Sequence, residues 1–142
     1  METRNPRFLD AVQEIFDRAR FVRDLGIELL EAGPGWCRSR LVLGDKHLQQ
    51  HHYVHAGVQA TLADHTAGAA ATTLVGPGEY VLTIEFKVNL LHPAAGERLE
   101  ARSAVIRPGR RIIVAESDVV AWRDGRETPV TKAIVTLAVK GG

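Results

Sequence analysis

The segment from Ala56 to Val75 constrains the fold of this chain more than any other. Its sequence is AGVQATLADHTAGAAATTLV, which makes nearly every side of a helix apolar or small. A helix with that pattern is buried on most sides, and its small residues let other backbone approach closely. A Gly-Pro-Gly sequence follows and ends it. We therefore predict a long central helix over about 56–75, enclosed by the rest of the chain.

The remaining segments favour one short helix and several strands. Apolar residues recur at helical spacing after Asn5-Pro6, which predicts an amphipathic helix over about 6–20. Residues 82–88 alternate between apolar and polar, which predicts a strand with one buried and one polar face. These elements predict a single α+β domain over 1–142. Further strands, separated by turn-forming junctions, are predicted at 27–31, 36–43, 98–106, 111–122 and 130–139.

Composition excludes several classes of protein. A chain of 142 residues with 45% hydrophobic residues can build one core without a disulfide or a structural metal. The net charge of +1 provides no broad positive field for nucleic acid or an anionic membrane. Cys37 is the only cysteine, and no apolar run has the roughly 20 residues that a bilayer span needs. We expect a cytoplasmic protein that binds neither nucleic acid nor membrane.

Asp64 is the candidate functional residue that the sequence makes most conspicuous. Histidine aside, it is the only charged side chain between Ala56 and Val75. A buried carboxylate is costly unless it is hydrogen-bonded or paired. One interpretation is that Asp64 faces a polar seam and bonds to a neighbouring backbone group or hydroxyl. The other is that it acts as a catalytic base or nucleophile.

The start of the same helix supplies a second candidate group. His55-Ala56-Gly57 lies where backbone N–H groups lack helical partners, which suits the binding of a developing oxyanion. Ala56 and Asp64 are eight residues apart, however, and a helix rises about 12 Å over that distance. One helix can hardly bring both groups to the same reacting atoms. If both roles are correct, each site combines two chains, and a two-fold dimer carries two sites.

These residues form a longer pattern, Gln49-(x5)-His55-Ala56-Gly57-(x4)-Leu62-Ala63-Asp64, followed by Thr83 and Pro93. In this pattern, and in its element order after Ile27, the chain resembles the hotdog-fold acyl-CoA thioesterases of the PaaI-like, phenylacetate-pathway type. The resemblance implies an antiparallel sheet wrapped around the long central helix. It also implies a homodimer or a dimer of dimers (homotetramer). The substrate would be an acyl- or aryl-CoA, with no cofactor beyond the CoA of the substrate and no metal.

The resemblance also implies roles for individual residues. Asp64 matches the catalytic acid, which acts as nucleophile or as general base on water, and the Ala56 N–H matches the oxyanion donor. His55 is similar to the histidine that precedes that donor. Gln49 falls where the family has Asn or Gln to orient the thioester or the water, and Thr83 matches a residue that positions water in some members.

One departure from the family pattern concerns Ala56. The family more often has His-Gly-Gly, whereas this chain has alanine at the first glycine and keeps the second as Gly57. Alanine retains its N–H, so the oxyanion donor can survive. It adds a methyl group and loses the option of positive φ, which bears on the shape of the acyl pocket.

Each of these residues also has a purely structural interpretation. Gln49 can be a solvated loop amide, and with Gln50 adjacent the assignment can slip by one residue. Thr83 can be an ordinary strand residue, and His55 can be a helix cap. Cys37 is expected to be a buried, inert thiol.

Two clusters of side chains complete the list of candidates. Histidines are frequent in 44–55, but no cysteine or obvious carboxylate accompanies them, so we expect solvated side chains and no metal site. Three arginines, Arg107, Arg110 and Arg111, surround the Pro108-Gly109 turn. They are either CoA phosphate ligands or charged residues of an exposed hairpin tip.

The hypothesis that these observations favour is hydrolysis of an acyl-CoA thioester by water, with help from Asp64. Two alternatives remain open at this stage. One is a non-catalytic acyl-CoA-binding protein with the same fold. The other is a hotdog hydratase or dehydratase, for which His55 or His65 would supply the histidine.

Overall fold

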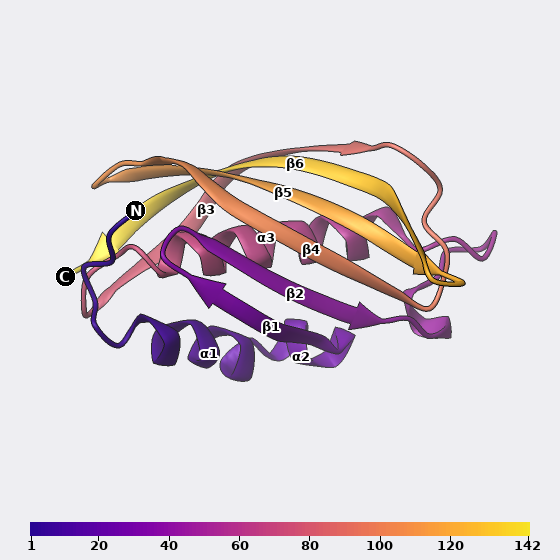
Figure 1. Ribbon diagram of the computed structural model, residues 1–142, viewed down its shortest axis with the longest axis horizontal. Helices are drawn as coiled ribbons and strands as arrows, with labels where there is room; N and C mark the ends of the chain where they lie inside the picture. Colours follow the sequence, from indigo (N-terminus) through magenta and orange to yellow (C-terminus); the bar gives the residue numbers. More distant parts are fainter.

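The computed structural model describes residues 1–142 as three helices, a 3-10 turn and six strands (Figure 1). In chain order they are α1 (Phe8–Arg18), α2 (Arg20–Leu25), β1 (Ile27–Gly33), β2 (Trp36–Val42), η1 (Asp45–His47), α3 (Ala56–Thr72), β3 (Glu79–Leu90), β4 (Arg98–Pro108), β5 (Ile112–Arg123) and β6 (Arg126–Gly141).

The six strands form one antiparallel sheet in the order β1-β2-β4-β5-β6-β3, and the sheet curves around α3 (Figure 1). Small residues on the inner faces allow this close packing. Ser39 Oγ of β2 lies 2.5 Å from Thr66 Oγ1 of α3, and Ser117 Oγ of β5 donates to the Ala63 carbonyl at 2.7 Å. The predicted α+β architecture with a long central helix is confirmed.

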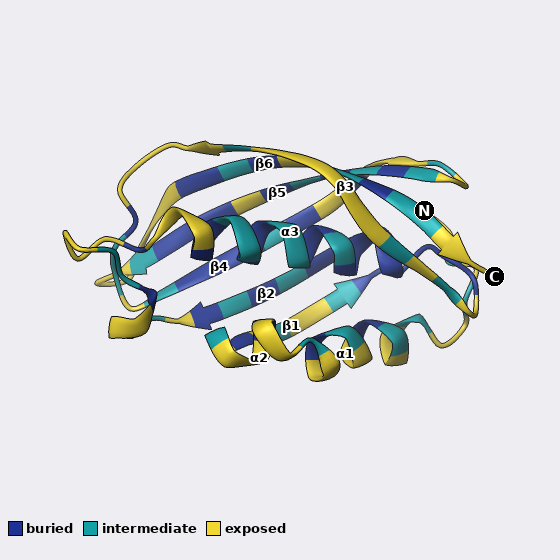
Figure 2. Ribbon diagram, turned by 180° about the vertical axis from the view of Figure 1, so that it is seen from behind, coloured by how far each residue is buried: buried dark blue, intermediate teal, exposed yellow.

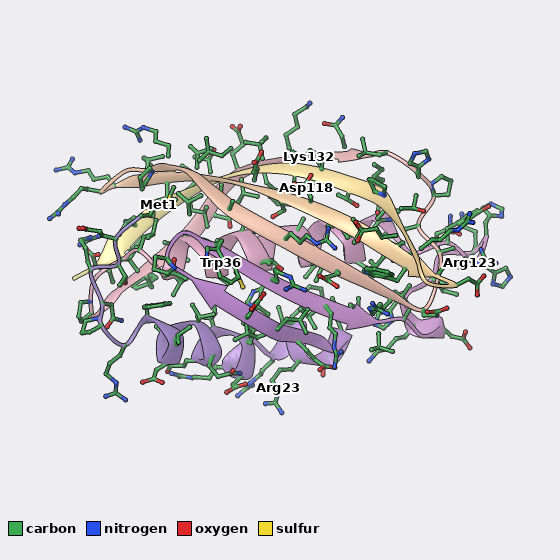
Figure 3. All side chains as sticks on the ribbon, in the orientation of Figure 1. Met1, Arg23, Trp36, Asp118, Arg123 and Lys132 are labelled. Atoms are coloured by element: carbon green, nitrogen blue, oxygen red, sulfur yellow. The ribbon has the colours of Figure 1, made fainter.

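The outer face of the sheet carries several ion pairs between neighbouring strands. Asp118 of β5 and Lys132 of β6 lie on it side by side, with their charged groups 3.1 Å apart (Figure 3). On the same face, nearer the β1 edge of the sheet, Arg38 of β2 forms ion pairs with both Glu31 and Glu100. This face therefore follows the ordinary alternation of an antiparallel sheet packed on one side only.

The helices differ in detail from their predicted bounds. The N-terminal helix is divided at Ala19, whose ψ of 94° is extended, so that α1 and α2 are separate helices along the β1 edge. Gly26 then ends α2 with a φ of 93°. α3 begins at Ala56 as expected but ends at Thr72, three residues early. None of the helices has both the length and the apolar character needed to cross a membrane.

The predicted buried face of β3 is wrong. Leu82, Ile84 and Phe86 are 51%, 60% and 45% exposed, and β3 is the most exposed strand in Figure 2. The physical reason is position, because β3 is the edge strand and pairs only with β6. An edge strand leaves its outer backbone groups unpaired and its side chains partly uncovered.

A bulge also changes the alternation within β3. Its pairing with β6 shifts between Thr83 and Glu85, so that Ile84 is the extra residue. Thr83 pairs with Leu137 and faces α3 in consequence, because directly paired residues share a face. The simple apolar and polar alternation assigned Thr83 to the solvent face, whereas the bulge allows it to reach the central helix.

Candidate functional site

Asp64 of α3 and Thr83 of β3 form the centre of the site. Thr83 Oγ1 donates a hydrogen bond to Asp64 Oδ1 at 2.7 Å, and this is the only hydrogen bond of the carboxylate within the chain. Both residues line a pocket of about 290 Å³ between α1, α3 and β3. A carboxylate accepts up to about four hydrogen bonds, so Asp64 keeps most of its capacity for a substrate or water.

The surroundings of Asp64 favour proton uptake. Burial raises the pKa of its carboxyl group above the ordinary value, and the hydrogen bond from Thr83 lowers it by a smaller amount. The first sequence-based interpretation of Asp64, a hydrogen bond to a neighbouring hydroxyl, is confirmed, whereas the second, a catalytic base or nucleophile, stays a prediction. The side chain does bond to a hydroxyl, and it also lies in an open pocket with a raised pKa, as a general base requires.

The N-terminus of α3 presents one free donor. His55 is the N-cap, and its Nδ1 accepts a hydrogen bond from the Gly57 N–H at 2.8 Å. The N–H groups of Val58 and Gln59 donate to the His55 carbonyl at 3.0 and 3.3 Å. Gly57 is therefore occupied in capping and does not serve as a second oxyanion donor. The Ala56 N–H has no acceptor within the chain.

Ala56 lies in a second pocket, of about 550 Å³, at the end of β3. Gln49, His55 and Pro93 line the same pocket, and the catalytic roles of Gln49 and His55 stay predictions. The Gln49 side-chain oxygen accepts a hydrogen bond from the His51 N–H, which leaves its amide nitrogen free to donate. The neighbouring Gln50 lines this pocket too, so the structure does not favour one glutamine by position alone.

The two pockets of one chain are separate. Asp64 and Thr83 line one and Ala56, His55 and Gln49 line the other, with no residue in common. The rise of about 12 Å along the helix between Ala56 and Asp64 explains the separation. A single chain therefore does not bring the carboxylate and the oxyanion donor to one reacting carbon.

Histidine and cysteine side chains outside these pockets have structural roles. His47 is buried, with Nδ1 accepting from the Gly44 N–H at 2.9 Å and Nε2 positioned 2.6 Å from the Leu25 carbonyl. No three His, Cys, Asp or Glu side chains lie together in an arrangement suited to a metal ion. Burial raises the pKa of the Cys37 thiol to about 12, which makes it a poor nucleophile.

The three candidate phosphate ligands lie on the β4–β5 hairpin and are exposed. This hairpin is at the opposite end of the molecule from the 48–55 loop (Figure 1). The Gly76 N–H and the Arg4 guanidinium, with a smaller effect of the Arg110 charge, lower the pKa of Glu79. Arg110 lines a separate pocket with Arg4, whose guanidinium pairs with Glu79 of the Asp64 pocket at 2.6 Å.

The structure adds residues that the sequence did not identify as part of the site. Ala11 and Ile15 of α1 and Gly68 of α3 line the pocket of Asp64. His65, which the sequence offered only as the histidine of a hydratase or dehydratase, lines it as well. The amphipathic pattern of α1 predicted a packed helix but not its partner. Only the packing of α1 against α3 shows that it forms one wall of this pocket.

Comparisons with known proteins identify the family. A family model described as the thioesterase superfamily matches residues 51–128, more than half of the chain. Among curated relatives, the 1,4-dihydroxy-2-naphthoyl-CoA hydrolase of Listeria monocytogenes is 28% identical over 116 residues. That alignment covers 82% of this chain and 92% of the relative.

Solved structures support the same assignment. The crystal structure of a thioesterase family protein from Silicibacter pomeroyi has a TM-score of 0.93 and 36% identity, covering 95% of this chain and 99% of that one. The PaaI protein of the E. coli phenylacetic acid degradation operon shares the fold, with a TM-score of 0.86 at 18% identity and coverage of 99% and 98%. The expected hotdog fold is confirmed. The chain belongs to the thioesterase superfamily and is a thioester hydrolase.

Proposed function

We propose that the protein hydrolyses an acyl- or aryl-CoA thioester to the free acid and CoA, with Asp64 as base or nucleophile. The observation that carries this proposal is the Asp64 carboxylate, which has a raised pKa and one hydrogen bond, from Thr83, in an open pocket. The CoA hydrolase activity named for the Listeria relative supports a CoA thioester as substrate. No separate cofactor or metal is required for the reaction.

In the general-base course, Asp64 removes a proton from water as the water oxygen attacks the thioester carbon. The Ala56 N–H donates to the resulting oxyanion. Collapse of the tetrahedral intermediate breaks the C–S bond, and the proton held by Asp64 passes to the leaving CoA sulfur. In the nucleophilic course, ionised Asp64 attacks the carbon itself, and the C–S bond breaks to release CoA thiolate. Water then hydrolyses the acyl-Asp64 anhydride, which frees the acid, restores the Asp64 carboxylate and provides the proton that the thiolate takes up.

We propose further that each site combines Asp64 of one chain with the Ala56 N–H of a second copy. The separation of the two pockets within one chain supports this arrangement. The exposed edge strand β3, with Leu82 and Phe86 about half exposed, supports a contact between copies along this edge. The working unit is then a homodimer, and pairing of two such dimers gives the tetramer that the resemblance implies.

The test of the proposed function is thiol release from a panel of aliphatic and aryl acyl-CoA thioesters, detected with a thiol reagent. We expect turnover of at least one class, which also settles the acyl preference. Two results would contradict the proposal. One is tight thioester binding without thiol release, and the other is hydration of crotonyl-CoA without hydrolysis of any thioester.

Substitution of Thr83 tests how its hydrogen bond affects the pKa of Asp64. Thr83→Val removes the hydrogen bond that lowers the pKa of Asp64, so this pKa should rise further. Because the reaction needs ionised Asp64, the acidic limb of the pH profile of kcat/KM should move to higher pH. Thr83→Ser, which retains the hydroxyl, should leave the limb in place. An acidic limb that is the same in Thr83→Val and the wild type would contradict this account of Asp64.

We propose that Arg107, Arg110 and Arg111 bind the phosphates of CoA, since they are exposed and Arg110 shares a pocket with Arg4, the ion-pair partner of Glu79 at the Asp64 pocket. Replacing all three by Ala should raise KM for an acyl-CoA by about tenfold or more, the usual scale for hydrogen bonds to charged groups. KM for the matching acyl-pantetheine, which lacks the nucleotide, should not change.

A matched control for these arginines is available on the β5–β6 hairpin. Arg123 and Arg126 are exposed on that hairpin. Arg123 lies at the end of the molecule opposite the β4–β5 hairpin that carries the three arginines (Figure 3). Their replacement by Ala should leave KM for acyl-CoA unaltered. If the triple variant raised KM equally for the acyl-CoA and for the matching acyl-pantetheine, the three arginines would not bind the nucleotide of CoA.

A cytoplasmic location remains part of the proposal. Cys37 is the only cysteine, and its thiol is buried and inert, which fits a reducing compartment without requiring one.

A further inference from the structure

Gln59 is a long polar side chain on the buried side of α3. It is 3% exposed, follows Ala56 by less than one helical turn and lines the same pocket. Both polar atoms of its amide are engaged, since Nε2 donates to the Val54 carbonyl at 3.1 Å and Oε1 accepts from Thr131 Oγ1 at 2.6 Å. Val54 and Thr131 are buried as well. Gln59 therefore joins β6 to the turn that precedes α3.

The Ala56 N–H belongs to a peptide group whose carbonyl is held by the helix. This carbonyl is that of His55, and it accepts hydrogen bonds from the Val58 and Gln59 N–H groups at 3.0 and 3.3 Å. A peptide group is planar and trans, so its N–H points opposite to its carbonyl. Holding the His55 carbonyl thus aims the Ala56 N–H away from the helix, where a ligand can accept from it.

The preceding peptide group, between Val54 and His55, is held at both of its polar atoms. Its carbonyl accepts from the Gln59 side chain, and its N–H donates to the His47 carbonyl at 2.9 Å. Gln59 bonds to both peptide groups, through its backbone N–H to one and through its side chain to the other. The Thr131 hydroxyl orients the amide, because it donates to the oxygen and leaves the nitrogen to face Val54.

The surroundings of this turn explain why the donor needs such support. Residues 50–53 and 55–57 are exposed, and Val54 between them is buried. The core therefore holds this segment through Val54 and through the hydrogen bonds to the two peptide groups. A donor stabilises a developing oxyanion only when it is already oriented, and a small displacement removes much of its effect.

Building on the proposed function, we infer that Gln59 is a positioning residue that holds the Ala56 N–H in the direction the oxyanion needs, with Thr131 orienting its amide. Because the Gln59 amide is buried and bonded at both polar atoms, it acts through the backbone of Val54 and His55 rather than on the reacting atoms. Its contribution is therefore to kcat and depends on the Ala56 N–H.

Substitutions at both ends of this network test the inference. Gln59→Leu removes both amide hydrogen bonds, and kcat for thioester hydrolysis should fall about tenfold, a part of the loss expected when an oxyanion donor is removed, with little change in KM. Thr131→Val, which removes only the orienting hydroxyl, should lower kcat by less, and Thr131→Ser should stay close to the wild type. Should Gln59→Leu not fold, the two Thr131 variants carry the same test.

The double variant with Ala56→Pro, which lacks the donor N–H, gives the sharpest readout. If Gln59 acts through this N–H, adding Gln59→Leu to Ala56→Pro should change kcat by no more than about twofold. A further fall as large as in the single variant would show that Gln59 supports another part of the molecule, and would overturn the inference. Unchanged kcat in both Gln59→Leu and Thr131→Val would overturn it as well.

Thr73 is the matched control for the loss of buried hydrogen bonds. It is fully buried at the other end of α3, where its hydroxyl accepts from the Gly35 N–H at 2.8 Å and donates to the Ala70 carbonyl at 2.6 Å. Thr73→Val should lower Tm, as Gln59→Leu does, but leave kcat unchanged. An equal loss of kcat in the two variants would mean that destabilisation alone lowers activity, and Gln59 would have no positioning role.

Backbone ¹⁵N relaxation of Ala56 separates this inference from the proposed function. The N–H order parameter should be near the rigid-backbone value of about 0.85 in the wild type and Thr73→Val, and clearly lower in Gln59→Leu. If the wild type releases no thiol from any thioester, the proposed function fails, while the Ala56 amide still reports whether Gln59 holds it. An amide order parameter and chemical shift that Gln59→Leu leaves unaltered would overturn the inference.

Discussion

Replacing Asp64 by Asn is expected to lower kcat for thioester hydrolysis by about 10²–10⁴-fold, the usual contribution of a positioned acid–base group. Asn preserves the shape of the side chain, and its oxygen can still accept the hydrogen bond from Thr83. The amide cannot take a proton from water or attack the thioester, however. KM should change little, because the substrate pocket is unaltered. Steady-state thiol release measures both constants.

Thermal unfolding provides the control for this variant. Folding raises the pKa of Asp64, mainly through burial, so the ionised carboxylate destabilises the folded chain when the pH exceeds that pKa. Asp64→Asn should therefore have a higher Tm than the wild type at pH 7, and the difference should shrink as the pH falls and the wild-type carboxyl becomes protonated. Activity within about threefold of the wild type, roughly 0.7 kcal/mol of barrier, would disprove the catalytic role.

Removing the Ala56 N–H should have the second-largest effect on kcat for thioester hydrolysis. Ala56 is the first residue of α3, a position at which proline is well tolerated, and His55 has φ and ψ of −58° and 139°, which suit a residue before proline. Ala56→Pro thus deletes one N–H group and leaves the helix in place. We expect kcat to fall by about 10²–10³-fold, as for the loss of one oxyanion donor. Ala56→Gly, which keeps the N–H, should remain active.

Mixing the two inactive variants tests whether a site uses two chains. In a heterodimer of Asp64→Asn and Ala56→Pro chains, one site lacks both groups and the other has both. Random reassociation should restore roughly one quarter of wild-type activity, since half of the dimers are mixed and each has one intact site of two. No recovery after verified subunit exchange would mean that both groups act from the same chain. Sedimentation as a monomer at micromolar concentration would contradict the two-chain site outright.

The sequence predicted the parts of this structure that depend on local pattern. The long helix from Ala56 is confirmed because its small, apolar residues suit only a central position. Asp64 stood out because a charge is rare in such a segment, and the structure places it in a pocket. The pairing of β4 with β5 and of β5 with β6 followed from the turn residues between them.

Features that depend on tertiary packing were missed. The bulge at Ile84 adds one residue to β3, which no alternation pattern reveals, and it determines that Thr83 faces Asp64. The sequence offered His55 as a helix cap, but it did not show that the cap engages the Gly57 N–H, because this depends on the orientation of the His55 ring.

The composition of the Asp64 pocket bears on how such an enzyme can diverge. Its reacting groups lie on α3 and β3, whereas one wall belongs to α1, a short helix that precedes every strand of the sheet in the chain. Ala11 and Ile15 on that wall are distant in sequence from Asp64 and Thr83. Substitutions there can reshape the groove while the reacting groups stay unchanged. The acyl range of descendants of this chain can therefore evolve through its first eighteen residues, independently of the hydrolytic step.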